Sequence, residues 1–213
     1  MTRLLAVGLG SLIVVLAQPC QALEAPAATA DRDGSPWSGV SVSPAYAWDT
    51  VPIFGGARDA PRSMFSLDLR LHRPIVTRKG LRLDYTAGIV PVELEGGTVV
   101  EDPALGQRKQ TVYGAGIDPV GFFALFGDGT SRLFASFRGG ARLFQKAVPN
   151  PRGIRFDFTA DFALGLARRV GGHAWLTAGP EFHHVSNGGL GDFNPSLNYV
   201  ALRVGVLVER RDH

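Results

Sequence analysis

The clearest chemical signal in the sequence is a histidine two positions before a serine, at His184 and Ser186. A serine hydroxyl is a weak nucleophile until a base takes its proton, and a neighbouring histidine can act as that base. Side chains two positions apart on a strand share one face, so the imidazole and the hydroxyl should be neighbours. Asn187 and the backbone N–H groups of Gly188 and Gly189 could donate to a tetrahedral oxyanion. The pattern predicts a serine nucleophile with a histidine base, and no metal or cofactor is expected.

The same two residues also fit an ordinary polar collar at the rim of a barrel, and this alternative stays open. No phosphate-binding loop is predicted, because the glycine pair follows a strand pattern and no helix pattern comes after it. The remaining histidines show no metal-ligand spacing, and we expect them at the rim or in the interior: His72, His173, His183 and His213.

The elements that must position this site are strands, as residues 154–166 show best. Odd positions in this segment are charged, polar or small, and a helix would mix the two sets. The segment is longer than the ordinary strand of about 5–6 residues and long enough for a tilted membrane-spanning strand of about 9–11. The even positions are all apolar: Ile154, Phe156, Phe158, Ala160, Phe162, Leu164 and Leu166.

The same alternation recurs along the chain and gives an even number of strands, as single-chain outer-membrane barrels require. The sequence predicts an all-β fold, an eight-stranded antiparallel up-and-down transmembrane β-barrel with both termini in the periplasm. Three prolines inside the strand patterns, Pro44, Pro119 and Pro180, indicate either bulges or strand boundaries that lie elsewhere. The expected strands are 40–48, 65–72, 81–89, 112–124, 133–143, 154–166, 174–186 and 200–208. Longer loops are expected at 50–62, 94–110, 145–152 and 187–197, and shorter turns at 73–80, 126–131 and 168–173.

The charged faces of the strands indicate which side is inside, because side chains fill the interior of an eight-stranded barrel. Five acidic and six basic residues are nearly balanced, which predicts a paired network and no open pore. The apolar set, whose parity His184, Ser186 and Asn198 share, should then face lipid. A soluble β-sandwich or lipocalin-like periplasmic barrel, with the apolar face inward, is the alternative that periodicity does not exclude. The expected interior charges are Asp68, Asp84, Asp157, Asp161 and Glu181 with Arg70, Arg82, Arg138, Arg142, Arg155 and Arg203.

The N-terminal segment differs from the rest of the chain and predicts export. Arg3 precedes an apolar run over 4–17, and small residues at Cys20 and Ala22 offer a cleavage site, so 1–22 is typical of a secretory signal peptide. Residues 23–35 are expected to form a short disordered lead-in, and 36–213 are expected to form the barrel. Cleavage removes the only cysteine, so no disulfide is expected, and leaves 21 basic against 19 acidic residues, a charge too weak for nucleic-acid binding.

The run Phe182-His183-His184-Val185-Ser186-Asn187, followed by Asn194-Pro195 and a closing strand, resembles the lipid A 3-O-deacylase (acyloxyacyl hydrolase, PagL-like) family. The specific resemblance covers about residues 179–206. It implies an eight-stranded barrel in the outer membrane of a Gram-negative bacterium, inserted by the barrel-assembly machinery as a monomer or homodimer. It also implies hydrolysis of the ester-linked 3-hydroxyacyl chain of lipid A in lipopolysaccharide. Ser186 would be the nucleophile, His184 the base and Asn187 part of the oxyanion region.

The chain departs from the family pattern at the third catalytic position. The family has a glutamate twelve residues after the serine, and this chain has Asn198 there. Glu181 points inward by parity, and Asp192 lies in the following loop. An amide can orient a histidine, but the Asp→Asn change in a serine protease triad costs about 10⁴ in rate. Two functions therefore stay open, a lipid A esterase and a catalytically inactive barrel with a structural or adhesive role.

Overall fold

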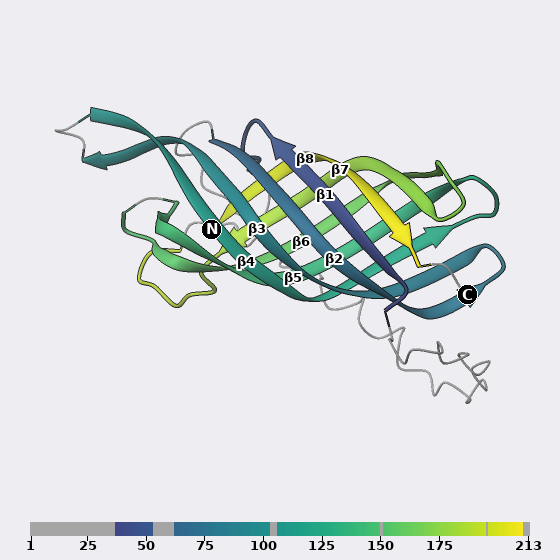
Figure 1. The fold of residues 1–213 in the computed structure, drawn as a ribbon. Coiled ribbons are helices and arrows are strands. Elements are labelled where there is room, and N and C mark those ends of the chain that lie inside the picture. The colour runs from purple at the N-terminus through teal and green to yellow at the C-terminus, as the bar shows by residue number, and fades with distance from the viewer. Residues whose placement is uncertain (1–36, 53–61, 103–105, 150, 195, 211–213) are drawn as a thin grey trace, which may run out of the picture. The chain divides into compact units, whose positions relative to one another are not determined.

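In the computed structural model, the described residues are 37–52, 62–102, 106–149, 151–194 and 196–210, and they form one closed antiparallel barrel (Figure 1). The predicted signal peptide and lead-in lie outside these residues and stay predictions. Within the described part of the chain, no helix has the length and apolar character needed to cross a bilayer. The strands are β1 (Gly39–Ala47), β2 (Arg62–Arg78), β3 (Leu81–Asp102), β4 (Gly106–Phe126), β5 (Ser131–Val148), β6 (Ile154–Arg169), β7 (Ala174–Ser186) and β8 (Leu197–Glu209).

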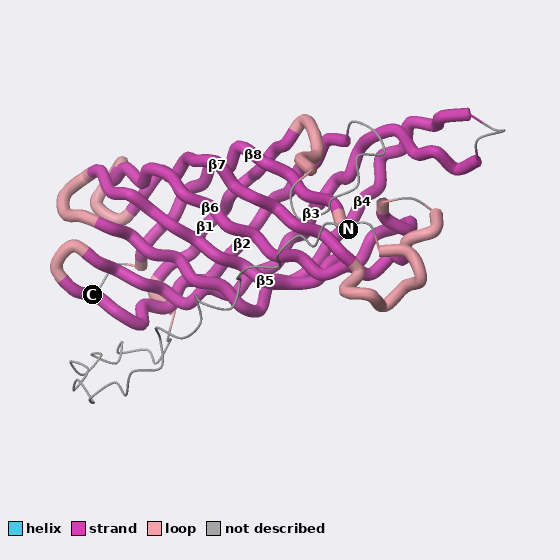
Figure 2. The backbone as a smooth tube through the Cα atoms, turned by 180° about the vertical axis from the view of Figure 1, so that it is seen from behind, coloured by secondary structure: helices cyan, strands magenta, loops and turns pink. Residues whose placement is uncertain are grey.

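Each strand pairs with the next in the sequence, and β1 closes the barrel against β8. Val42, for example, lies opposite Leu69 of β2 on one side and Val206 of β8 on the other. Figure 2 shows the strands tilted around the barrel, with the short turns that follow β2, β4 and β6 at one end. The predicted eight-stranded up-and-down topology is confirmed.

The outer surface of the barrel is apolar and the interior is charged. Along β7, Trp175, Glu181 and His183 are buried, whereas Leu176 between them is exposed. A soluble sandwich or lipocalin-like barrel would bury its apolar set, so this arrangement excludes that alternative and confirms the predicted parity. Exposed apolar side chains lie on several strands and include Ile117, Leu133, Phe162, Leu164, Leu202 and Val204.

Arg138 is the centre of the interior ion-pair network. It contacts Asp68 at 2.6 Å, Glu181 at 2.6 Å and Asp161 at 3.1 Å. Such contacts offset the desolvation of each buried charge, which otherwise costs several kcal/mol.

The interior is more acidic than the predicted near balance, because the described residues bury eight carboxylates against five arginines, with Arg82 half-buried beside Asp84. Glu93, Glu95 and Asp118 add to the acidic set because β3 and β4 present them inward. Arg155 does not belong to the interior, since it is exposed near the start of β6 and its Nε donates to the Phe144 carbonyl at 2.9 Å.

The prediction of a long loop at 94–110 is also wrong. Most of it belongs to β3 and β4, which remain paired from Gly96↔Thr111 to Asp102↔Gly106. Figure 1 shows this hairpin extending beyond the neighbouring strands. Thr98, Val99 and Val100 favour extended backbone, and their propensity outweighs the glycines that suggested a loop. The expected turn at 73–80 is likewise shorter, because β2 continues to Arg78.

Of the three prolines expected at bulges, only Pro119 lies at one, within the register shift between Ile117 and Val120. Pro44 and Pro180 are paired in regular register with Leu67 and Leu202. A proline lacks its N–H toward only one of the two neighbouring strands, and the described pairing is interrupted on that side. For Pro44 the interruption lies between Val42 and Ala45 against β8. For Pro180 it lies between 178 and 181 against β6. A gap in one ladder therefore accommodates these prolines without a bulge.

Candidate active site

His184 and Ser186 lie on the outer face of β7, at the end opposite the short turns. The Nε2 atom of His184 is 3.2 Å from Oγ of Ser186, within hydrogen-bonding distance. Both side chains are half-buried. Val185, which lies between them in the sequence, and His183, which precedes them, point inward and are buried. The strand thus places imidazole and hydroxyl side by side as the spacing predicts.

Asn198 lies directly across from His184 on β8, with the two Cα positions paired. The Nδ1 atom of His184 is 2.6 Å from Oδ1 of Asn198. When Nδ1–H donates to this amide oxygen, Nε2 carries the lone pair that can accept the Ser186 proton. Asn198 is 0% exposed although its parity is outward, so its amide is shielded from solvent.

Neither alternative carboxylate reaches His184 in this structure. Glu181 is buried inside the barrel, where it contacts Arg138 at 2.6 Å and Arg203 at 2.8 Å. Asp192 is exposed in the connection between β7 and β8. Among the described residues, the side chain that lies within hydrogen-bonding distance of His184 Nδ1 is Asn198, so the third position is an amide.

Asn187 organises the turn that follows Ser186. Its Nδ2 donates to the Phe193 carbonyl at 2.9 Å, and its Oδ1 accepts from Gly189 N–H at 2.9 Å. Its own backbone N–H donates to Oδ1 of Asn194 at 2.9 Å. Gly188 and Gly189 have φ values of 63° and 80°, which favour glycine.

These contacts narrow the candidates for an oxyanion donor. The backbone N–H groups of Asn187 and Gly189 are already donated inside the turn. The Gly188 N–H has no acceptor among the residues that the structure describes. The roles expected for Asn187, Gly188 and Gly189 stay predictions, and of these three backbone N–H groups only that of Gly188 is not donated to another described residue.

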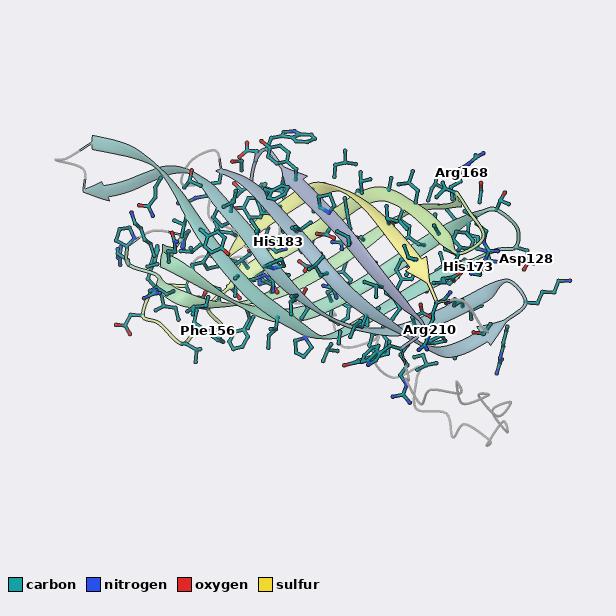
Figure 3. All side chains as sticks on the ribbon, viewed as in Figure 1. Asp128, Phe156, Arg168, His173, His183 and Arg210 are labelled. Atoms are coloured by element: carbon teal, nitrogen blue, oxygen red, sulfur yellow. The ribbon has the colours of Figure 1, made fainter. Side chains whose placement is uncertain are left out.

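Aromatic side chains border the serine on the outer face. Phe158 of β6 lies opposite Ser186 in register and is 44% exposed. Phe156 packs edge to face on Phe158, with ring centroids 5.2 Å apart, and Figure 3 shows Phe156 pointing away from the barrel. The alternation along 154–166 places both phenylalanines on the lipid face, but it does not predict that they lie beside Ser186, because parity alone does not give the register between β6 and β7.

A sequence model of a known family matches residues 75–206, well over half of the chain, and its description is lipid A 3-O-deacylase (PagL). The chain belongs to the lipid A 3-O-deacylase (PagL) family. No curated protein matches the sequence. The match confirms the family that the residues around Ser186 predicted.

Several solved structures resemble this chain, and the PagL structure among them has the fold that family membership implies. The crystal structure of the outer membrane enzyme PagL superposes with a TM-score of 0.57 at 15% identity, covering 78% of this chain and 97% of that one. Neisserial surface protein A gives 0.46 at 12% identity, covering 82% and 97%. OprG from Pseudomonas aeruginosa gives 0.47 at 10% identity, covering 81% and 96%. The PagL match shows that this chain has the fold of an outer-membrane barrel.

Proposed function

We propose that the chain is a lipid A 3-O-deacylase-like esterase that acts on lipid A in the outer leaflet. The observation that carries the proposal is the hydrogen-bonded line from Ser186 through His184 to Asn198 on the apolar outer face of the barrel. An acyl chain of a neighbouring lipid would meet the serine there, beside Phe158.

In the proposed reaction, His184 Nε2 takes the proton of Ser186 Oγ as Oγ bonds to the carbonyl carbon of the 3-hydroxyacyl ester. The Gly188 N–H and the second hydrogen of the Asn187 amide are the proposed donors to the oxyanion. The ester C–O bond then breaks, and His184 returns the proton to the leaving sugar oxygen. Water repeats the sequence on the acyl-enzyme, releasing the hydroxy acid and restoring the serine.

Asn198 favours a second function, a barrel of this family that has lost catalysis and keeps a structural or adhesive role. An amide orients His184 but does not offset the charge of the imidazolium that forms in the reaction. The two functions differ in one measurable product, the released 3-hydroxy acid.

The test is expression of the full-length chain in a Gram-negative host that lacks 3-O-deacylase activity, followed by mass spectrometry of lipid A. We expect lipid A that lacks one 3-hydroxyacyl chain. Ser186→Ala should abolish the loss, whereas Ser131→Ala, an exposed serine at the other end of the barrel, should leave it unchanged. Unmodified lipid A in cells that contain folded, membrane-inserted wild-type protein would contradict the esterase and favour the non-catalytic role.

We also propose that the chain is exported and cleaved after Ala22, and that the barrel-assembly machinery inserts it as a monomer or homodimer. N-terminal sequencing of protein from outer-membrane fractions should begin at Leu23. Recovery of protein that still begins at Met1 would contradict cleavage.

A further inference from the structure

Behind the candidate active site, the barrel interior holds a cluster of three potential metal ligands. His183 of β7 points inward next to His184, and Figure 3 shows it among the strands. Glu93 and Glu95 come from β3, two positions apart on its inner face. All three side chains are buried, and their ligating atoms lie within 4.8 Å of one another.

The atoms of this cluster that lack hydrogen bonds are those a metal would use. Oε1 of Glu93, Oε1 of Glu95 and Nε2 of His183 are buried and have no hydrogen-bond partner among the described residues. The Nε2 atom lies 3.5 Å from Oε1 of Glu93, too far for a good hydrogen bond. Buried polar atoms are normally satisfied, so three that converge need a common explanation.

The other polar atoms of the same side chains are all held. Arg142 Nε contacts Glu93 Oε2 at 2.6 Å, and the Tyr199 hydroxyl donates to Glu95 Oε2. His183 Nδ1 is 2.5 Å from Oδ1 of Asp161. A ligating histidine ordinarily donates its second ring N–H to a carboxylate in this way, which leaves Nε2 with its lone pair toward the metal.

The charge of the interior also favours a cation. Eight buried carboxylates face five buried arginines among the described residues. Glu93 and Glu95 share one face of a strand, and two neighbouring carboxylates in a desolvated interior repel each other. Arg142 neutralises Glu93 directly, and a bound cation would neutralise its neighbour.

A second cluster, Asp161 and Glu181 with His183, is already filled. The Arg138 guanidinium lies 3.1 Å from Asp161 and 2.6 Å from Glu181, so an arginine takes the place of a metal there. In the first cluster Arg142 contacts only Oε2 of Glu93, and Oε1 of both glutamates has no hydrogen-bond partner among the described residues. A doubly protonated His183 bridging Asp161 and Glu93 is the competing explanation of its geometry.

We propose that Glu93, Glu95 and His183 bind one divalent transition-metal ion of the zinc type inside the barrel. One imidazole and two carboxylates form a ligand set that zinc accepts, with water completing the coordination. The ion would join β3 to β7 directly behind His184, and through Tyr199 it would also brace β8 next to Asn198. Its role is structural, to hold the two strands that carry the candidate active site.

The test measures metal bound to the full mature chain, folded in detergent, stripped with a chelator, equilibrated with Zn²⁺ or Co²⁺ and separated from free ion. We expect one ion per barrel in wild type, a visible Co²⁺ absorption band, and loss of both in Glu95→Gln and His183→Gln. Tyr199→Phe, which removes one orienting hydrogen bond, should weaken binding by about 10- to 100-fold.

His72→Gln is the matched control. His72 is also a buried interior histidine with Nδ1 toward a carboxylate, Asp84, but its Nε2 is hydrogen-bonded to Ser41 at 2.8 Å. This variant should bind metal as wild type does, and so should Ser186→Ala, which separates metal binding from catalysis. Folded wild type that retains no Zn²⁺ or Co²⁺, or a Glu95→Gln variant that binds normally, would overturn the site in favour of the protonated histidine.

Discussion

His184 and Asn198 are paired across β7 and β8, and the imidazole Nδ1 lies 2.6 Å from the amide oxygen. The amide therefore occupies the position from which a carboxylate would orient the histidine and stabilise its charged form. Asn198, His184 and Ser186 lie at the hydrogen-bonding distances of a catalytic triad, but the third residue carries no negative charge.

Asn198→Asp should raise kcat on lipid A, because it replaces the amide with a carboxylate of about the same size whose oxygen would lie beside His184 Nδ1. The upper bound on the gain is the roughly 10⁴-fold effect of the corresponding amide in a serine protease. Asn198→Leu, which keeps approximate volume and removes the acceptor, should lower kcat. Rates on purified lipid A in detergent micelles measure both. An Asn198→Asp variant no faster than wild type would show that the missing charge does not limit the reaction.

Gly188→Ala should reduce kcat more than Gly189→Ala. Both positions have positive φ, so each alanine costs roughly 1–2 kcal/mol of backbone strain. A Cβ at Gly188 would also lie 2.9 Å from Cδ2 of Phe158, whereas one at Gly189 meets nothing within 4 Å. Adding Phe158→Ala should recover part of the Gly188→Ala loss through relief of this contact. Equal losses of kcat in the two glycine variants would argue against a role for the Gly188 N–H as a positioned donor to the oxyanion.

Arg138→Met should destabilise the barrel by about 3–5 kcal/mol, because it leaves several buried carboxylates without their partner. Asp68, Asp161 and Glu181 all contact this guanidinium. Arg168→Met, at an exposed position near the end of β6, should change stability by no more than about 0.5 kcal/mol. Urea unfolding in lipid vesicles, followed by tryptophan fluorescence, gives both values. Similar stabilities would mean that the interior network contributes little.

Phe162→Arg should cost about 2–4 kcal/mol of folding free energy in a bilayer, the range for a charge at the midplane of a barrel. Phe162 is 53% exposed in the middle of β6. Val170→Arg, just beyond the end of β6, should cost only about 0–1 kcal/mol, as near an interface. Folding yields in vesicles compare the two. An equal cost at both positions would contradict a lipid-facing belt centred on Phe162.

The sequence by itself determined the number of strands, the face of most strand side chains and the pairing of His184 with Ser186. These follow from alternation with a period of two, which is a local property and is strong in long strands such as 154–166. The residues around Ser186 also carried enough of the family pattern to predict the lipid A 3-O-deacylase family that the comparison confirms.

Only the tertiary structure decided which residues of different strands meet. Parity gives a face but not a register, so it did not place Phe158 beside Ser186, nor show that Asn198 accepts from His184. For the same reason no metal-ligand spacing can be read from the sequence. His183 lies about ninety positions from Glu93 and Glu95, and only closure of the barrel brings them within 4.8 Å. Contacts across a closed barrel depend on strand order and shear, and these are properties of the whole sheet.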